Sequence, residues 1–145
     1  MCLYADKGNP LKGEPRLEFD KDGYVTCWKV YQLINHKLAP FYQACSGPIT
    51  NGWIVSDRQN RKVLYDDLDC VERSIIRVYR GIHVCTDEKS AETLRGPDDD
   101  KESLFFVVTV RCHKSQLVAV SRDRDEAVFM KVFLKKADHD KALKG

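Results

Sequence analysis

The chain has 145 residues, of which 43% are apolar and 32% are charged, and its formal net charge is +2. This composition excludes general disorder, and the length suffices for one domain with a buried core. Both signs of charge are spread through the sequence, so a nucleic-acid partner is not expected. No apolar run approaches the roughly 18 residues of a membrane span, and no signal-peptide pattern opens the chain, which predicts a cytoplasmic protein without a membrane partner.

Six cysteines stand at positions 2, 27, 45, 70, 85 and 112. Most lie in apolar strand patterns, and none forms a C-x-x-C pair. In a reducing compartment such thiols act as small buried hydrophobes. We therefore predict free cysteines rather than a disulfide framework.

Residues 1–22 have little periodicity and contain several Gly and Pro, which predicts an extended N-terminal arm. Asp20 to Gly23 favours a turn, with Gly23 at the position that tolerates positive φ. Residues 24–33 follow as the first strand, because bulky β-forming residues occupy both of its faces.

The next segments have weaker patterns. Strand-like residues at 53–56 and 62–65 flank a polar loop at 57–61, which predicts a hairpin. The acidic segment 66–72 has apolar residues three apart, which favours one helical turn.

Two long apolar runs, 75–85 and 104–112, are predicted as the central strands of the fold. Between them, Thr86 or Asp87 can cap a helix over about residues 88–95. Further strands are expected at 117–120 and 127–134, joined by a tight turn.

This order of elements predicts the α+β class, with a mixed or mainly antiparallel, strongly curved sheet, one helix packed on it and a short C-terminal helix. The predicted organisation is an arm at 1–22, a single domain at 23–136 and a C-terminal helix or tail at 137–145.

Arg80 is an unusual residue in this pattern. It alternates with three apolar residues of one predicted strand face, Val78, Ile82 and Val84. A buried arginine needs a partner, so Arg80 marks either a structural ion pair or an anion site, unless Gly81 forms a bulge that turns it outward.

The string Val-Tyr-Arg-Gly at 78–81 resembles the first-strand arginine motif of ADP-ribosyltransferases. The resemblance implies that Arg80 contacts the phosphates of NAD. Those enzymes also need a Ser-Thr-Ser strand and a downstream glutamate. No Ser-Thr-Ser follows Arg80, and Glu126 comes directly after a predicted turn, so this activity is only an alternative.

A zinc site would require His83, Cys85, Cys112 and His113 to converge. Three of them could do so if the central strands pair. Neighbouring residues of a strand point to opposite faces, however, so Cys112 and His113 cannot both contribute. We predict core thiols, no metal and no cofactor.

Cys2 becomes N-terminal if Met1 is removed, and its free amine can then act as a base for the thiol. In this respect the chain resembles N-terminal nucleophile amidotransferases and the SRAP family of DNA–protein crosslinking proteins. The residues at 3–6 do not match those families, and we assign no catalytic residue.

The strings at 27–30, 80–84, 107–110 and 117–120 resemble small uncharacterised proteins carried by phages and mobile elements. This resemblance implies an accessory protein that counters host defence. Such a protein would bind a host defence protein or sequester a nucleotide signal.

We therefore expect a non-enzymatic binding protein whose partner is a phosphate-bearing nucleotide or a host protein. Arg77, Tyr79, Arg80 and His83 are the predicted ligand-binding residues, because positive charge and an aromatic ring suit a flat ligand with phosphate. Other aromatics, such as Trp53, are expected mainly in the core, although a few of them could line a pocket and stack on a flat ligand. The alternatives are an enzyme that uses Arg80 or an N-terminal cysteine, and a pure protein–protein interaction module. The sequence leaves open whether the chain forms a homo-oligomer.

Overall fold

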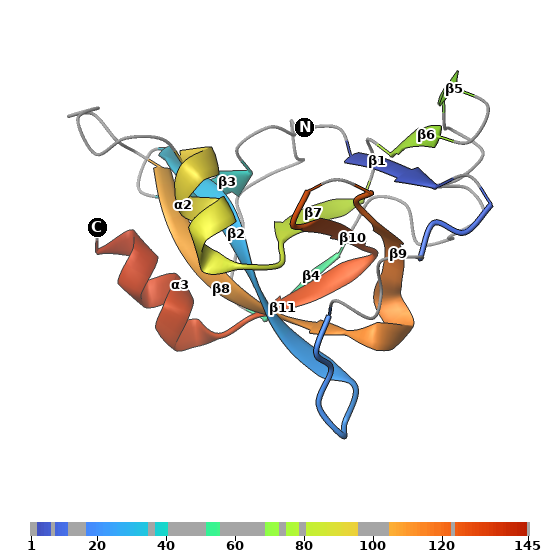
Figure 1. The fold of residues 1–145 in the computed structure, drawn as a ribbon. Coiled ribbons are helices and arrows are strands. Elements are labelled where there is room, and N and C mark those ends of the chain that lie inside the picture. The colour runs from blue at the N-terminus through green and yellow to red at the C-terminus, as the bar shows by residue number, and fades with distance from the viewer. Residues whose placement is uncertain are drawn as a thin grey trace.

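The computed structural model describes residues 3–6, 8–11, 17–34, 37–40, 52–55, 69–72, 75–78, 81–95, 105–122 and 124–144. The elements, in chain order, are β1 (Leu3–Asp6), β2 (Tyr24–Ile34), β3 (Lys37–Pro40), β4 (Gly52–Val55), β5 (Asp69–Glu72), β6 (Ile75–Val78), β7 (Ile82–Cys85), α2 (Glu88–Arg95), β8 (Phe105–His113), the 3-10 helix η2 (Lys114–Gln116), β9 (Leu117–Val120), β10 (Glu126–Phe129), β11 (Lys131–Leu134) and α3 (Lys136–Leu143) (Figure 1). No helix in the described ranges is long and apolar enough to cross a membrane.

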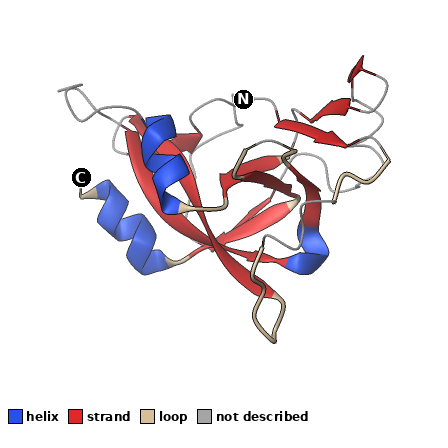
Figure 2. Ribbon diagram, in the orientation of Figure 1, coloured by secondary structure: helices blue, strands red, loops and turns tan. Residues whose placement is uncertain are grey.

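A large sheet organises the fold, with the strand order β4-β11-β8-β2-β7-β10-β9 and β3 paired to β2. Its longest ladder joins β2 and β8 in antiparallel register from Tyr24–His113 to Gln32–Phe105. The described pairings of this sheet are antiparallel, and the helices α2 and α3 accompany the described strands (Figure 2). The α+β prediction is confirmed. Among the described strands the sheet stays open, so its strong curvature remains a prediction.

A second, small sheet has the order β1-β6-β5. β1 lies in the segment predicted as an extended arm and pairs with β6 through the Leu3–Val78 register. β5 occupies part of the segment for which we predicted a helical turn, and this prediction is wrong at residues 69–72. Antiparallel pairing with β6 outweighs the weak three-residue spacing, because ladder hydrogen bonds satisfy the backbone of β5.

The predicted strand at 75–85 is wrong as a continuous element. β6 ends at Val78 in the small sheet, and β7 begins at Ile82 in the large one. Gly81 lies directly before β7 with a φ of 91°, a conformation that favours glycine. Val78 packs with Leu3 of β1, whereas Ile82 and Val84 enter the main core, so these residues do not share one strand face.

The predicted strand at 127–134 is also divided. β10 pairs with β7 and β9, whereas β11 pairs with β4 and β8. Met130 lies between them, and its backbone N–H donates to the carbonyl oxygen of Gln116 at 2.8 Å. The apolar residues run through both β10 and β11, so the sequence pattern alone does not reveal the break.

Several local predictions are confirmed. α2 begins after Asp87, whose Oδ1 accepts a hydrogen bond of 2.7 Å from the backbone N–H of Ser90. Gly23 has a φ of 85° in the turn before β2. The predicted loop at 57–61 and the strand at 62–65 lie outside the described residues.

The two faces of the large sheet are covered differently. Its inner face forms the main core, in which Tyr31 and Phe129 are the largest fully buried side chains. On its outer face, α2 packs over part of β2, β7 and β8 through Ala91 and Leu94. β1 covers β9 and β10 through Leu3 and Ala5. This arrangement leaves the outer-face side chains of β4 exposed and those of β11 partly exposed.

Candidate ligand-binding face of the sheet

The predicted ligand-binding residues are distributed over different parts of the molecule. Arg77 lies on β6 of the small sheet, where its register partner is Tyr4 of β1. His83 lies on β7 of the large sheet opposite Val128 and is only 7% exposed. Tyr79 and Arg80 lie outside the described residues. The structure therefore places Arg77 and His83 in separate sheets rather than on one strand.

Two of the residues considered as zinc ligands, Cys85 and Cys112, do not converge. Cys85 packs beneath α2 on the outer face of the sheet, whereas Cys112 faces the main core on the inner face. Within the described ranges, no group of three or more His, Cys, Asp or Glu residues is arranged to hold a metal ion. Cys2 lies outside those ranges.

Two of the described thiols, those of Cys85 and Cys112, lie in environments that disfavour the thiolate. Cys27, Cys85 and Cys112 are free and buried. Burial, followed by the negative charge of Glu126, raises the pKa of Cys85 to about 12. Burial and a hydrogen bond with Cys27 raise the pKa of Cys112 well above its usual value. Cys85 and Cys112 are therefore poor nucleophiles near neutral pH.

The outer face of β4 carries the most exposed apolar side chains of the described chain. Trp53 is 46% exposed and Val55 is 51% exposed, whereas Ile54 between them packs against the main core. This alternation follows from the two-residue period of a strand. Trp53, which we expected mainly in the core, is instead accessible to a ligand.

Neighbouring side chains of β11 hold the Trp53 ring. Phe133 is the register partner of Trp53, and Lys131 is that of Val55. The rings of Trp53 and Phe133 meet edge to face, with centroids 5.2 Å apart. The Nζ of Lys131 lies 4.9 Å from the centroid of the Trp53 ring. An aromatic surface and a cation are therefore adjacent on this face.

The same pattern continues onto β8 and β2. Arg111 of β8 is the register partner of Phe133, and its guanidinium carbon lies 5.0 Å from the centroid of the Tyr24 ring. We call Trp53, Lys131, Phe133, Arg111 and Tyr24 the aromatic–cationic face.

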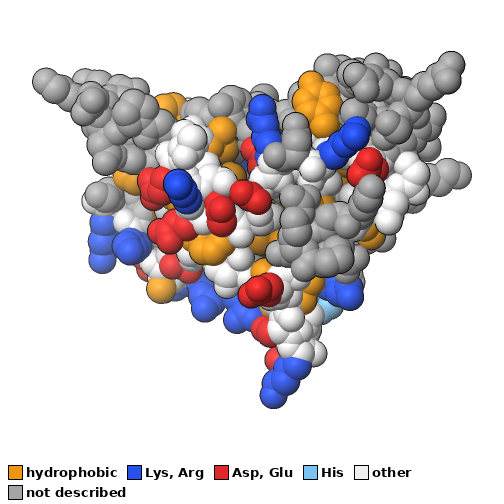
Figure 3. Space-filling view, viewed as in Figure 1, with side chains coloured by type: hydrophobic (Ala, Val, Ile, Leu, Met, Phe, Trp, Pro, Cys, Tyr) orange, Lys and Arg blue, Asp and Glu red, His pale blue; other side chains and the backbone are white. Residues whose placement is uncertain are grey.

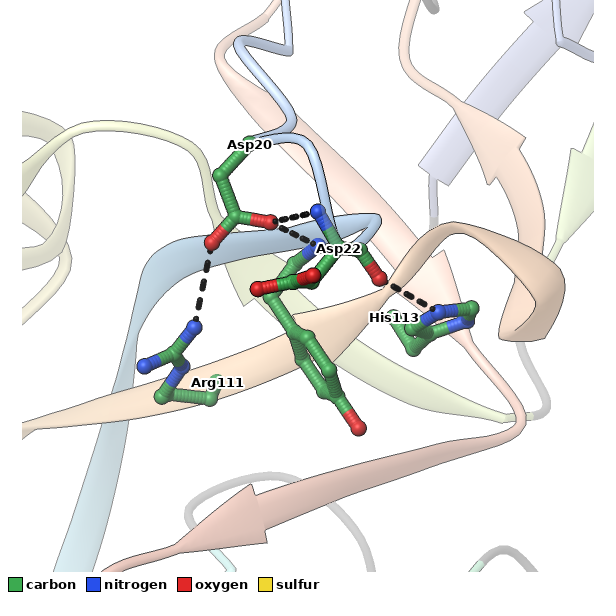
Figure 4. A network of polar contacts seen from close by, with 5 residues as sticks. Asp20, Asp22, Arg111 and His113 are labelled. Atoms are coloured by element: carbon green, nitrogen blue, oxygen red, sulfur yellow. Dashed lines mark hydrogen bonds and ion pairs between the residues drawn. The ribbon is translucent and has the colours of Figure 1, made fainter.

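A tight turn positions Asp20 beside this face (Figure 4). Its Oδ1 accepts hydrogen bonds of 2.9 Å from the backbone N–H groups of Asp22 and Tyr24. Its Oδ2 lies 3.3 Å from Nη2 of Arg111. The hydrogen bond from Tyr24 is the main reason that the pKa of Asp20 lies below its usual value, and the Arg111 charge adds to it.

His113 braces the same turn rather than offering a metal ligand. Its Nδ1 accepts a hydrogen bond of 3.1 Å from the backbone N–H of Ser115. Its Nε2 therefore carries the proton that is donated to the carbonyl oxygen of Asp22 at 3.1 Å (Figure 4). A Cβ atom on Gly23 would lie 2.8 Å from that Nε2, so the close approach requires glycine.

Charge is not uniform around the molecule. Acidic side chains gather over α2 in Figure 3, and the exposed Glu88 and Glu92 belong to that helix. Lys and Arg side chains lie along the lower margin of the same view (Figure 3).

Sequence reasoning missed the aromatic–cationic face because its parts come from distant segments. Lys131 and Phe133 alternate with buried Val132, a signal that indicates a strand with one exposed face. Nothing in that local pattern identifies β4 as its neighbour. No family model matches the chain, and neither a curated protein nor a solved structure was found to be similar to it.

Proposed function

We propose that this chain is a non-enzymatic binding protein for a flat ligand that carries phosphate, the chemistry of a nucleotide. One observation carries the proposal: Trp53 is 46% exposed and has the Lys131 ammonium 4.9 Å from its ring centroid. Lys131 lies over the ring, so a base would stack on the part of the ring that Lys131 leaves exposed, and the adjacent ammonium offers a charge for phosphate.

Stacking and charge act together at such a site. An exposed tryptophan provides a rigid apolar surface on which a base can stack, worth about 1 to 3 kcal/mol per base. Among the described residues, no carboxylate forms an ion pair with Lys131. Its charge is therefore available to a ligand phosphate, which it attracts as a point charge.

The proposal also agrees with the thiol environments and with the resemblance to phage-carried proteins. Raised pKa values make Cys85 and Cys112 poor nucleophiles, which favours binding over thiol chemistry at those two residues. In a phage accessory protein, the ligand would be a host nucleotide signal that is sequestered without turnover.

Isothermal titration calorimetry with ATP, adenosine and pyrophosphate tests the proposal. ATP combines the ring with the phosphates, whereas adenosine and pyrophosphate each supply one of them. We expect ATP to bind more tightly than either. Absence of ATP binding to the wild-type chain would contradict the proposal.

Substitutions then locate the site. Trp53→Ala should weaken ATP binding at least about fivefold, because it removes the stacking surface. Lys131→Met should weaken the binding of ATP and of pyrophosphate but leave the binding of adenosine unchanged. Lys89→Met, on exposed helix α2, is the matched control and should change nothing. If Tyr4→Ala abolishes binding while Trp53→Ala does not, the ligand lies on the small sheet beside Arg77.

A protein partner is the second candidate. β4 stands at the edge of the large sheet among the described strands, and its Trp53 and Val55 are exposed. An extended peptide can add to such an edge as a further strand. Val55→Ser would weaken this docking but leave ATP binding intact, and pulldown with the wild-type and Val55→Ser chains separates the two functions.

A further inference from the structure

We propose that Arg111 forms a second anion-binding position on the aromatic–cationic face, and that Asp20 restrains it. The site would then discriminate between ligands by the number of their phosphates. This inference rests on the proposed function and extends it to the class of nucleotide that is bound.

The position of Arg111 sets the reach that a ligand needs. β11 lies between β4, which carries Trp53, and β8, which carries Arg111. Two strand spacings separate these residues by about 10 Å along the sheet. A base stacked on Trp53 can place its first phosphate at Lys131, and a longer phosphate chain extends toward Arg111.

Arg111 has donors to offer at that position. Its side chain is 39% exposed, and the Tyr24 ring lies 5.0 Å from its guanidinium carbon. A guanidinium carries five N–H donors and suits bidentate contact with phosphate. Among the described residues, its hydrogen-bond partner is Asp20, through a single contact of 3.3 Å.

Asp20 opposes a phosphate at this position. Its carboxylate is 46% exposed and lies directly beside Arg111. The two backbone hydrogen bonds to its Oδ1, each 2.9 Å, hold it in place. A second anion at Arg111 must therefore either displace this carboxylate or bind against its negative charge.

The consequence differs between ligands. A monophosphate that contacts Lys131 is little affected by Asp20, because the carboxylate lies beside Arg111 instead. A triphosphate that extends toward Arg111 meets the carboxylate. Removal of the Asp20 charge should therefore improve binding of the triphosphate more than that of the monophosphate.

Asp20→Asn is the informative variant, because asparagine keeps an oxygen that can accept both backbone hydrogen bonds and removes the charge. Calorimetric affinities for AMP and ATP are measured for the wild-type chain, Asp20→Asn, Arg111→Met and the double variant. Asp22→Asn is the matched control, since Asp22 is an exposed carboxylate of the same turn. Circular dichroism verifies that each variant is folded.

We expect Asp20→Asn to tighten ATP binding by about twofold to fivefold, the range of one exposed ion pair, with a smaller change for AMP. The gain should disappear when Arg111→Met is added. An equal gain for AMP, an equal gain in Asp22→Asn, or a gain that persists without Arg111 would overturn the inference.

The proposed function is judged separately in the same experiment. ATP binding that is lost in Trp53→Ala supports that function even if Asp20→Asn changes nothing, in which case only the inference fails. If the wild-type chain does not bind ATP, the proposed function is overturned, and the inference that rests on it is overturned with it.

Discussion

Cys85 and Cys112 lie on opposite faces of one sheet, although both belong to strands that pair with β2. Cys85 is the register partner of Trp28 and contributes to the cluster beneath α2. Cys112 is the register partner of Val25 and contributes to the main core. Two thiols separated by the sheet cannot ligate the same ion, and each is instead a small buried apolar group.

The described thiols should resist alkylation. In the native protein near neutral pH, iodoacetamide should leave Cys27, Cys85 and Cys112 unmodified, because they are buried and because the pKa of Cys85 and that of Cys112 are raised. Peptide mapping by mass spectrometry measures each site, and the same reaction in urea should label all three. Rapid labelling of native Cys85 would contradict its burial.

The Cys85 thiol should make stability depend on alkaline pH. Its pKa is about 12 in the folded chain and near 9.0 in the unfolded chain, so the unfolded state loses this proton first. The stabilisation is complete below pH 9.0 and is lost as the pH rises toward 12, by up to about 1.4 kcal/mol per pH unit. Urea unfolding across this window, compared with Cys85→Ala, isolates the effect. If the free energy of unfolding has the same pH dependence in the wild-type chain and in Cys85→Ala, Cys85 does not contribute to it.

Gly23→Ala should destabilise the fold. Its φ of 85° strains any residue with a side chain, and the added Cβ would lie 2.8 Å from Nε2 of His113. We expect a loss of about 1 to 3 kcal/mol in the free energy of unfolding, measured with urea. Gly8→Ala is the control, because a Cβ there meets nothing within 4 Å. Equal stability of both variants would show that the turn tolerates a side chain.

Asp87 should stabilise α2 as its N-cap. Asp87→Ala removes the acceptor of the 2.7 Å hydrogen bond from Ser90 and should cost about 1 kcal/mol. Asp87→Asn keeps an acceptor and should cost less. Hydrogen bonds from Ser90 lower the pKa of Asp87, so its stabilisation is present above pH 3.8 and is lost as the pH falls below that value. Thermal unfolding near neutral and at acidic pH measures both effects. Equal melting temperatures for the wild-type chain, Asp87→Ala and Asp87→Asn would refute them.

Sequence periodicity predicted the elements that local residues specify. The alternation of residues 24–33, the helix at 88–95 and its cap at Asp87 are confirmed, because their patterns and hydrogen bonds depend on neighbours along the chain. The same reasoning failed at Gly81 and Met130, where an apolar run passes from one pairing partner to another. A run of apolar residues does not specify which strand will pair with it in the sheet.

The candidate site shows the same division. The sequence alone predicted an α+β chain with free cysteines. It also predicted Arg77 and His83 as ligand-binding residues on one strand. Only the tertiary structure separated those two residues between sheets and exposed Trp53 beside Lys131. The physical reason is that strand alternation is a local property, whereas the identity of neighbouring strands depends on pairing between residues far apart in the chain.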